Sequence, residues 1–555
     1  MFKQEMVTYF MSKGVLISPE FFETEPSSFD IPSFYLTLNK KVLSKPLVLN
    51  QDLFRLVHQG GVLDFNWVDF DCAKVLYEKT KSHHIYSQFI KDQKSSFNLS
   101  LSHPLLPLET ASFIPLLKKD SKYQVSILSS YDSKAKKREV QDFVKYFKKR
   151  YDFLKNVLCS RQELQESLSI ARLPRKKEGE VVTIIGLVLD KNITKNENIK
   201  ITLEDTTGVF DVLISKNKTE VYQLARDLVF DEVIGITGVM GSNIIFCNSL
   251  YLPEIPVNHE LKKAPDEAYV VFISDIHFGI KHFLAHDFMN FILWLRGEYG
   301  TEQQRDVSAK VGYLFITGDV VEGVGIYPGQ EEDLEIKDVY KQYEEATRYL
   351  KMIPERIKII ICGGNHDALR MSEPQPIFDK DISKGFYEIP NLIMVSNPGF
   401  VNIHSSEGFP GFDVLMYHGF SFPYFADNVP SIRDKGGLAR CDLIMKFLLQ
   451  RRHLAPSHSS TLYVPDDERD PLVIEQVPDI FVSGHIHQIT VGSYRNVSLI
   501  NSSCWVVQSE DNAKRGIIPH PGKIPLLNLK TREIKIMNFL DDSVKVLYTE
   551  RMGLK

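Results

Sequence analysis

The sequence predicts a multidomain α/β protein with a small helical N-terminal domain, a small β-barrel and a large layered α/β domain. Three observations predict this fold class. Apolar residues recur with helical spacing in the first 90 residues, period-two strands fill residues 179–256, and buried strands alternate with helices over residues 265–550. At roughly 150 residues per domain, 555 residues accommodate three to four such parts.

Composition excludes several classes of protein. With 43% hydrophobic and 25% charged residues, the chain is neither disordered nor fibrous. Lys and Arg number 66 against 71 Asp and Glu, and the net charge of −5 means that binding of nucleic acid needs a local site or a partner. The longest apolar stretch, residues 181–189, is about half of a membrane span, and Lys3, Glu5 and Lys13 interrupt any signal segment. We therefore expect a cytoplasmic protein with no membrane contact.

The six cysteines form no C-x-x-C pair, which argues against a disulfide framework and a structural zinc site. Before the barrel, three stretches differ in pattern. We expect a helical domain at residues 1–90, a linker rich in Ser, Pro, Leu and Lys at 91–125, and a basic amphipathic helix region at 126–178. The basic face of its helix, which includes Arg150, is either a solvated surface or a phosphate-binding strip.

Residues 179–256 form the predicted barrel. A helix at about 220–228 follows the third of five strands, and five strands with one helix favour an OB-type barrel. Such barrels often bind single strands through aromatic and basic residues, but few aromatics stand on these strands, so protein docking or a structural role fits at least as well. The strands are predicted at 181–188, 199–203, 209–214, 233–238 and 243–247.

Five predicted strands of the last part of the chain end in residues that carry chemistry. Ligands of α/β sheets bind outside the carboxyl ends of the strands, so these residues are expected at one edge. They are Asp275 and His277 after strand 269–274, Asp319 after 312–317, Asn365, His366 and Asp367 after 357–362, His418 after 414–417, and His485 and His487 after 480–482.

These residue types suit a metal site. Residues two apart in an extended chain point the same way, so Asp-x-His at 275–277 and His-x-His at 485–487 can each present two ligands to one side. Neighbouring side chains diverge, which lets Asn365 face a metal while His366 faces the substrate. Carboxylate, amide and imidazole ligands suit Mn²⁺, Fe or Zn²⁺ better than Ca²⁺. Any one histidine could be a satisfied core residue, but the whole set agrees in type, order and placement.

In this order, the motifs D-x-H, G-D, G-N-H-D, H-G and G-H-x-H resemble those of the calcineurin-like metallophosphoesterase superfamily. The resemblance implies a calcineurin-like α/β sandwich at 265–550 and two divalent metal ions, Mn²⁺ first with Fe or Zn²⁺ as alternatives. The ions would lie about 3.5–4 Å apart and share a hydroxide that attacks phosphorus. His366 would stabilise charge or protonate the leaving oxygen, with Asp367 orienting its ring. The implied ligands are Asp275, His277, Asp319 and His487 for one ion, and Asp319, Asn365, His418 and His485 for the other.

The sequence around the motifs resembles the small subunit of archaeal family D DNA polymerases over about residues 125–545. This resemblance implies a 3′→5′ exonuclease that proofreads for a separate large catalytic polymerase subunit. Its substrate would be the single-stranded 3′ end of DNA, and it would reach a sliding clamp through the complex. The segments that carry the resemblance are S-D-I-H-F-G from 274, G-D-V-V-E-G from 318, G-I-Y-P from 325, E-P-Q-P from 373, R-R-H-L-A-P from 451 and N-S-S-C-W from 501.

Two alternatives stay open. One is a stand-alone calcineurin-like nuclease or phosphoesterase, which a barrel ahead of the phosphoesterase motifs disfavours. The other is a non-catalytic scaffold similar to the eukaryotic polymerase B subunits, which share the layout but have lost metal ligands. The chain departs from the family pattern at Phe278 and Ile280, where we expect Val and Ser, and these departures introduce base stacking near the first motif as a hypothesis.

Overall fold

The computed structural model describes residues 123–132, 136–466, 468–507, 518–540 and 545–551, with short pieces among the first 49 residues. The chain divides into two compact units, Met1–Pro115 and Leu116–Lys555. In the first unit, β1 (Leu16–Ile17) pairs in parallel with β2 (Val48–Leu49). The helical domain predicted at 1–90 and the linker predicted at 91–125 lie largely outside the described residues.

Two β-sheets form the centre of the second unit. Buried side chains from both sheets pack together between them, among them Phe272, Phe315, Val401 and Val482. The seven-stranded sheet has the order β12-β11-β10-β9-β18-β19-β20 and the six-stranded sheet the order β16-β17-β15-β14-β13-β3. The bounds in the first are β9 (Tyr269–Ile273), β10 (Val311–Thr317), β11 (Lys358–Cys362), β12 (Leu392–Met394), β18 (Lys523–Asn528), β19 (Glu533–Asn538) and β20 (Lys545–Arg551). Those in the second are β3 (Val125–Ser130), β13 (Gly399–Ile403), β14 (Phe412–Met416), β15 (Ile480–Ser483), β16 (Thr490–Tyr494) and β17 (Val497–Asn501).

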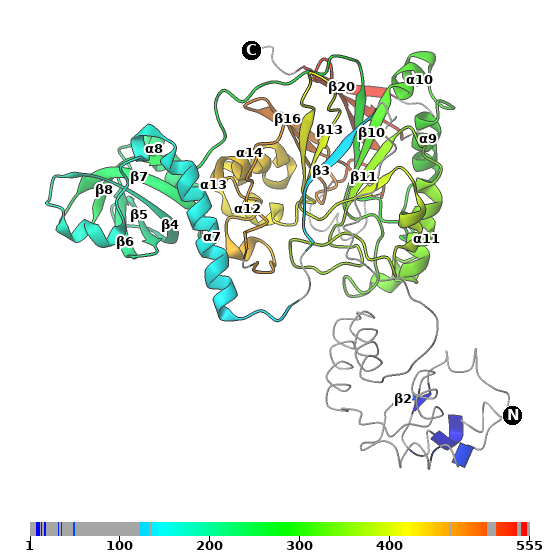
Figure 1. The fold of residues 1–555 in the computed structure, drawn as a ribbon, viewed down its shortest axis with the longest axis horizontal. Helices are drawn as coiled ribbons and strands as arrows, with labels where there is room; N and C mark the ends of the chain where they lie inside the picture. The colour runs from blue at the N-terminus through cyan, green and yellow to red at the C-terminus, as the bar shows by residue number, and fades with distance from the viewer. Residues whose placement is uncertain are drawn as a thin grey trace. The chain divides into compact units, whose positions relative to one another are not determined.

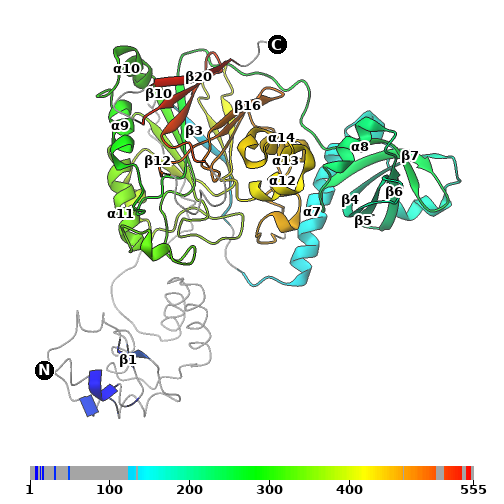
Figure 2. The ribbon, with the colours of Figure 1, turned by 180° about the vertical axis from the view of Figure 1, so that it is seen from behind.

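Helices cover the outer faces of both sheets, as Figures 1 and 2 show. The seven-stranded sheet packs against helices through Phe288, Phe291 and Tyr343, and the six-stranded sheet through Phe425 and Leu448. The result is the layered α/β domain that the sequence predicts. The helices on the first side are α9 (Ala285–Leu295), α10 (Glu302–Ala309) and α11 (Val339–Leu350), and those on the second are α12 (Phe422–Asn428), α13 (Pro430–Arg433) and α14 (Cys441–Arg451).

All five strands that were predicted to end in chemical motifs are present. β9, β10 and β11 are parallel neighbours in one sheet, and β14 and β15 are parallel neighbours in the other. Because both sets have the same direction within their sheet, each brings its carboxyl ends to one edge.

Strand β3 was not predicted. The sequence analysis placed residues up to 125 in a linker and those from 126 in a helical region, but Val125–Ser130 pairs antiparallel with β13 at the edge of the six-stranded sheet. Its residues alternate poorly, since Ile127 and Leu128 are both exposed, so period-two patterning gives no signal there.

The predicted barrel is present and closed. Its strands follow the order β4-β5-β6-β8-β7, and the one helix among them is α8 (Thr219–Arg226). Alternate residues such as Val182, Ile184, Ile201 and Ile236 fill its interior. The strands are β4 (Val181–Ile193), β5 (Ile199–Asp205), β6 (Gly208–Ile214), β7 (Val233–Met240) and β8 (Ile245–Tyr251).

Helix α7 (Val140–Cys159) lies between the barrel and the two large sheets. Its Tyr151, Leu154 and Leu158 pack on the barrel. Arg150, predicted on the basic face, is instead 1% exposed, and its Nε donates to Asp470 Oδ2 at 2.7 Å. Arg150 is therefore a buried partner of the neighbouring domain and not part of a phosphate-binding strip.

A second buried ion pair holds the barrel in place. Arg451, in the last turn of α14, lies 2.9 Å from the carboxylate of Glu232 just before β7, and both side chains are buried.

Among the residues that the structure describes, no helix is both long and apolar enough to cross a bilayer.

Candidate metal and catalytic site

The predicted ligands lie in the loops that follow β9, β10, β11, β14 and β15. Three elements of the seven-stranded sheet and two of the six-stranded sheet thus meet at one place. Backbone bonds tie the loops together, since Asp275 N donates to Gly318 O at 3.0 Å and Gly484 N donates to His418 O at 2.9 Å. The site is therefore built from the ends of both sheets.

One group of donor atoms gathers around Asp275. His487 Nε2 lies 3.3 Å from Asp275 Oδ1, and His277 Nε2 lies 3.9 Å from the same oxygen. The two imidazole Nε2 atoms are 3.1 Å apart. All three donor atoms fall within 4.8 Å of one another, which is the spacing of ligands around one cation.

A second group gathers around His418. Its Nε2 lies 3.3 Å from Asp319 Oδ2 and 3.0 Å from Asn365 Oδ1, and His485 completes the group. Asp319 Oδ2 also lies 3.9 Å from His277 Nε2. Asp319 thus stands between the two groups, where a shared ligand is expected.

The orientation of the ligands fits a divalent metal. His418 Nδ1 lies 2.9 Å from Thr317 O, so its proton belongs on Nδ1 and its Nε2 is left to bind. His277 Nδ1 lies 2.7 Å from Glu322 Oε2, which orients that ring in the same manner.

The electrostatics fit as well. Burial raises the pKa of the Asp319 carboxyl, but the charges of His418 and His366 outweigh burial and hold that pKa well below its usual range. Burial lowers the pKa of His418, yet the charge of Asp319 raises it to about 10. Burial and the charge of His418 lower the pKa of His485 to about 3.

The ligand loops have an unusual backbone. Residues with a side chain rarely adopt positive φ, and each such position costs of the order of 1–3 kcal/mol. Residues held there against strain cluster at functional sites. Five of the seven predicted ligands are in this region: Asp275 (φ 50°), His277 (57°), Asp319 (49°), His485 (70°) and His487 (58°).

Two glycines allow the ligands to approach the backbone. A Cβ at Gly318, where φ is 85°, would collide with the ring of His418, and a Cβ at Gly364 would collide with the carboxylate of Asp319. The absence of a side chain is therefore required at both positions of the G-D and G-N-H-D motifs.

His366 and Glu322 form a pair beside the two groups of donor atoms around Asp275 and His418, called the metal groups below. The His366 ring lies 4.7 Å from that of His277, and its Nδ1 lies 3.0 Å from Glu322 O and 3.5 Å from Glu322 Oε2. Glu322 is 1% exposed, and the sequence analysis assigned it no role. The available signal was its place three residues after Asp319 in G-D-V-V-E-G.

Two expectations from the sequence are not met. Asp367 was expected to orient the His366 ring, but its carboxylate accepts from the backbone N–H groups of Val320, Val321 and Gly364, so it fixes the loops instead. Phe278 was a hypothetical stacking residue, but it is 0% exposed and its ring stacks on Tyr349 in the core. The Val expected there is replaced by a larger core residue, with no consequence for a ligand.

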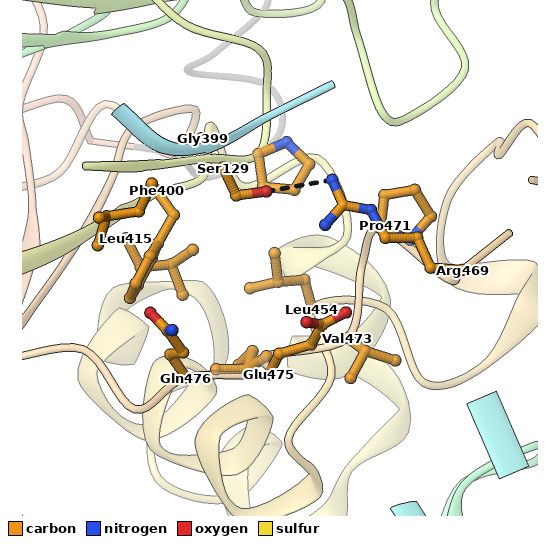
Figure 3. Close-up of a pocket in the computed structure, with 13 residues that line it drawn as sticks. Ser129, Gly399, Phe400, Leu415, Leu454, Arg469, Pro471, Val473, Glu475 and Gln476 are labelled. Atoms are coloured by element: carbon orange, nitrogen blue, oxygen red, sulfur yellow. Dashed lines mark hydrogen bonds between the residues drawn. The ribbon is translucent and has the colours of Figure 1, made fainter. Parts of the chain in front are cut away.

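A separate pocket lies at β3, shown in Figure 3. It has a volume of about 140 Å³ and is lined by apolar groups such as Phe400, Leu415 and Leu454, with Arg469 donating to Ser129 Oγ at 3.2 Å. None of the predicted ligands lines it, so this pocket is distinct from the metal groups.

The fold and the site define a calcineurin-like phosphoesterase domain. The sequence pattern of that family, described as calcineurin-like phosphoesterase, matches residues 268–489. The match implies divalent metals, in agreement with the His and Asp groups.

The chain belongs to the DNA polymerase II small-subunit family. It is 38% identical over 390 residues to the DNA polymerase II small subunit of Methanothermobacter thermautotrophicus. The aligned residues cover 70% of this chain and 78% of the relative. The Archaeoglobus fulgidus subunit is 38% identical, covering 69% of this chain and 74% of the relative. The Pyrococcus furiosus subunit is 36% identical, and the match covers 72% of this chain and 64% of the relative. The family resemblance predicted from the motifs is confirmed.

Proposed function

We propose that this chain is the 3′→5′ exonuclease, or proofreading, subunit of a heterodimeric replicative DNA polymerase and hydrolyses DNA phosphodiesters with two divalent metal ions. The observation that carries the proposal is the convergence of all seven predicted ligands on Asp319 and Asp275, with no ligand replaced. Mn²⁺ is the first candidate because the donors are carboxylate, amide and imidazole; Fe and Zn²⁺ fit the same set.

Each side chain has a role in this proposal. Asp275, His277 and His487 hold one ion, Asn365, His418 and His485 hold the other, and Asp319 contacts both. When bound, the ions supply the positive charge that stabilises an in-line displacement at phosphorus.

His366 is the proposed proton donor to the leaving 3′ oxygen. Burial lowers the pKa of its imidazole, but the charges of Asp319 and Glu322 raise it to about 9, so the ring is protonated at neutral pH. Because Glu322 lies at Nδ1, the other ring nitrogen is free to donate. Asp367 then acts through the backbone of the loops and not on the ring.

The partner in this proposal is a large catalytic polymerase subunit, since the relatives are small subunits of DNA polymerase II. A chain with a net charge of −5 has no general attraction for DNA. The large subunit therefore supplies most of the affinity for DNA. This chain reaches a sliding clamp only through the two-subunit complex. The barrel, which we assign to the OB type, lies on the same unit as the site.

The test is the change His366→Ala in the full chain. We expect unchanged binding of Mn²⁺ and a loss of 10²–10⁴-fold in the degradation of single-stranded DNA from its 3′ end. His458→Ala is a matched control, because that ring is 61% exposed. Undiminished Mn²⁺-dependent degradation by the His366 variant would refute the proposed mechanism.

Three further measurements separate the alternatives. A purified chain with no bound transition metal and no Mn²⁺-stimulated cleavage would favour a non-catalytic scaffold. Purification without a large subunit, with full nuclease activity, would favour a stand-alone nuclease. Excision of a mismatched 3′ nucleotide by the two-subunit complex is the result expected for proofreading.

A further inference from the structure

The loop after Glu322 carries an aromatic side chain beside the catalytic histidine. Tyr327 belongs to the G-I-Y-P segment, to which the proposed reaction gives no role. Its ring centroid lies 6.4 Å from that of His366 with an angle of 61° between the planes. Tyr327 is 36% exposed, whereas most of the large aromatic residues around the site are buried. An exposed ring thus stands next to the proposed proton donor.

The loop is held firmly in place by two buried glutamines. Gln330 Oε1 accepts from Ile326 N at 2.9 Å, and Gln330 Nε2 donates to Glu322 Oε1 at 2.9 Å. Gln342 Oε1 accepts from Gly323 N at 2.8 Å, and Gln342 Nε2 donates to Gly323 O at 3.1 Å. The Gln330 bond fixes the loop to the same carboxylate that contacts His277 and His366, and the Gln342 bonds fix its backbone at Gly323.

The ring itself is also anchored. The Tyr327 hydroxyl donates to Asp333 Oδ2 at 3.1 Å. Burial and the charge of Glu322 raise the pKa of this hydroxyl, so it stays protonated and keeps donating. A ring fixed at its hydroxyl end loses little conformational entropy when a ligand packs on it.

Beyond its contacts with Asp333 and His366, the ring is open to solvent. Val324 is 49% exposed, and a Cβ built at Gly325 would meet nothing within 4 Å. The metal groups account for recognition of a phosphate, but they give no use to an exposed aromatic and aliphatic surface. Flat aromatic surfaces beside a phosphate site are the means by which proteins hold unpaired nucleobases.

We propose that Tyr327 is a stacking subsite for the terminal nucleobase of an unpaired DNA strand whose phosphodiester lies at the metal groups. This inference rests on the proposed exonuclease function. Stacking uses the π-face that every base has, so the subsite accepts all four bases. A paired terminal base is already stacked and hydrogen-bonded in its duplex, so the subsite favours frayed or mismatched ends.

The first test compares two substrates with the full chain and Mn²⁺. One is a single strand with a normal 3′-terminal nucleotide, and the other has an abasic 3′-terminal nucleotide. Tyr327→Leu is expected to lower kcat/KM for the normal strand by about tenfold to a hundredfold. It is expected to leave kcat/KM for the abasic strand unchanged. Tyr327→Phe, which keeps the ring, is expected to stay within a few-fold of wild type on both. Tyr387→Leu is a matched control, since Tyr387 is 40% exposed on a segment that carries no ligand.

An equal loss on both strands would mean that Tyr327 only supports the loop, and a wild-type rate on the normal strand would mean that the ring binds no base. Either result overturns the subsite. Absence of Mn²⁺-dependent cleavage of both strands by the wild type contradicts the proposed function instead.

A second measurement does not depend on hydrolysis. A strand with 2-aminopurine at its 3′ end is titrated with the full chain in Mn²⁺, every chain also carrying His366→Ala so that the strand binds without being cleaved, and its fluorescence is recorded. Stacking quenches this base, so the wild type and Tyr327→Phe are expected to quench and Tyr327→Leu is not. Equal quenching by wild type and Tyr327→Leu would overturn the subsite.

Discussion

Glu322→Gln is the change that tests the site most directly. The carboxylate is buried and lies 2.7 Å from His277 Nδ1 and 3.5 Å from His366 Nδ1. Burial raises its pKa, but the two histidines outweigh burial and lower it, so the group is ionised. Glutamine keeps the shape and removes the charge, which leaves one proposed ligand and the proposed proton donor with a neutral partner.

The expected magnitude follows from those two contacts. Loss of the outer partner of a metal-ligating histidine typically costs 10–100-fold in metal affinity or activity, or about 1.4–2.7 kcal/mol. His366 has a raised pKa of about 9, and its protonated form donates, so activity is lost as pH rises through that pKa. In the variant the pKa falls toward the ordinary value of about 6.5, and the loss begins at lower pH.

The assay has two readouts on the full chain. Calorimetric titration gives the affinity of the chain for Mn²⁺. The rate of single-strand degradation between pH 6 and 10 gives the alkaline limb of the pH–rate profile, the range in which activity falls as pH rises. Glu331→Gln removes the same charge at an exposed position nearby and is expected to change neither. Wild-type Mn²⁺ affinity together with an unmoved alkaline limb in Glu322→Gln would refute the reasoning.

Three further predictions concern stability. Asp470→Ala leaves Arg150 and His453 buried without their shared partner, so we expect a loss of about 3–5 kcal/mol in urea unfolding, partly recovered by adding Arg150→Met; no recovery would contradict this account. Burial and the charge of Arg150 lower the pKa of His453 to about 4, so the unfolded chain binds more protons than the folded one between about pH 6.5 and 4. Stability should therefore fall by about 3 kcal/mol as pH is lowered through that window, and His453→Gln should flatten the dependence; a slope unchanged in the variant would count against His453. Chelation by EDTA should lower the melting temperature, since metal at a hundred times its Kd stabilises by about 2.7 kcal/mol; an identical temperature with and without Mn²⁺ would exclude metal binding.

The strands and loops that carry the site were predictable because their signals are local. A buried run such as 269–273 followed at once by Asp275 and His277 needs no distant information, and parallel strands bring their ends to one edge. The same reasoning predicted the strands of the barrel, where apolar residues alternate along β4 and β5.

What escaped prediction depends on partners far away in the chain. β3 is a strand because β13, some 270 residues later, supplies its hydrogen bonds. Arg150 is buried because Asp470 lies 320 positions away, and without that partner a basic residue on an amphipathic helix is expected in solvent. Glu322 meets His277 and His366 because the loops after β9, β10 and β11 lie together, and the positive φ of Asp275, His277 and Asp319 in the first two is not specified by alternation or helical spacing.

The strained ligand loops favour the enzymatic proposal over the scaffold. Each of the five ligands with positive φ costs of the order of 1–3 kcal/mol, and together they cost as much as the about 5–15 kcal/mol that stabilises a domain. A scaffold without metal would gain stability by placing glycine or asparagine there, since neither the sheet order nor the barrel requires Asp or His at these positions. The glycines at 318 and 364 add to this argument, because a Cβ at either position would collide with the side chain of a proposed ligand, His418 or Asp319. The strained backbone of the five ligands, together with the space at the two glycines, is the arrangement expected of a site that binds a cation and hydrolyses a phosphoester.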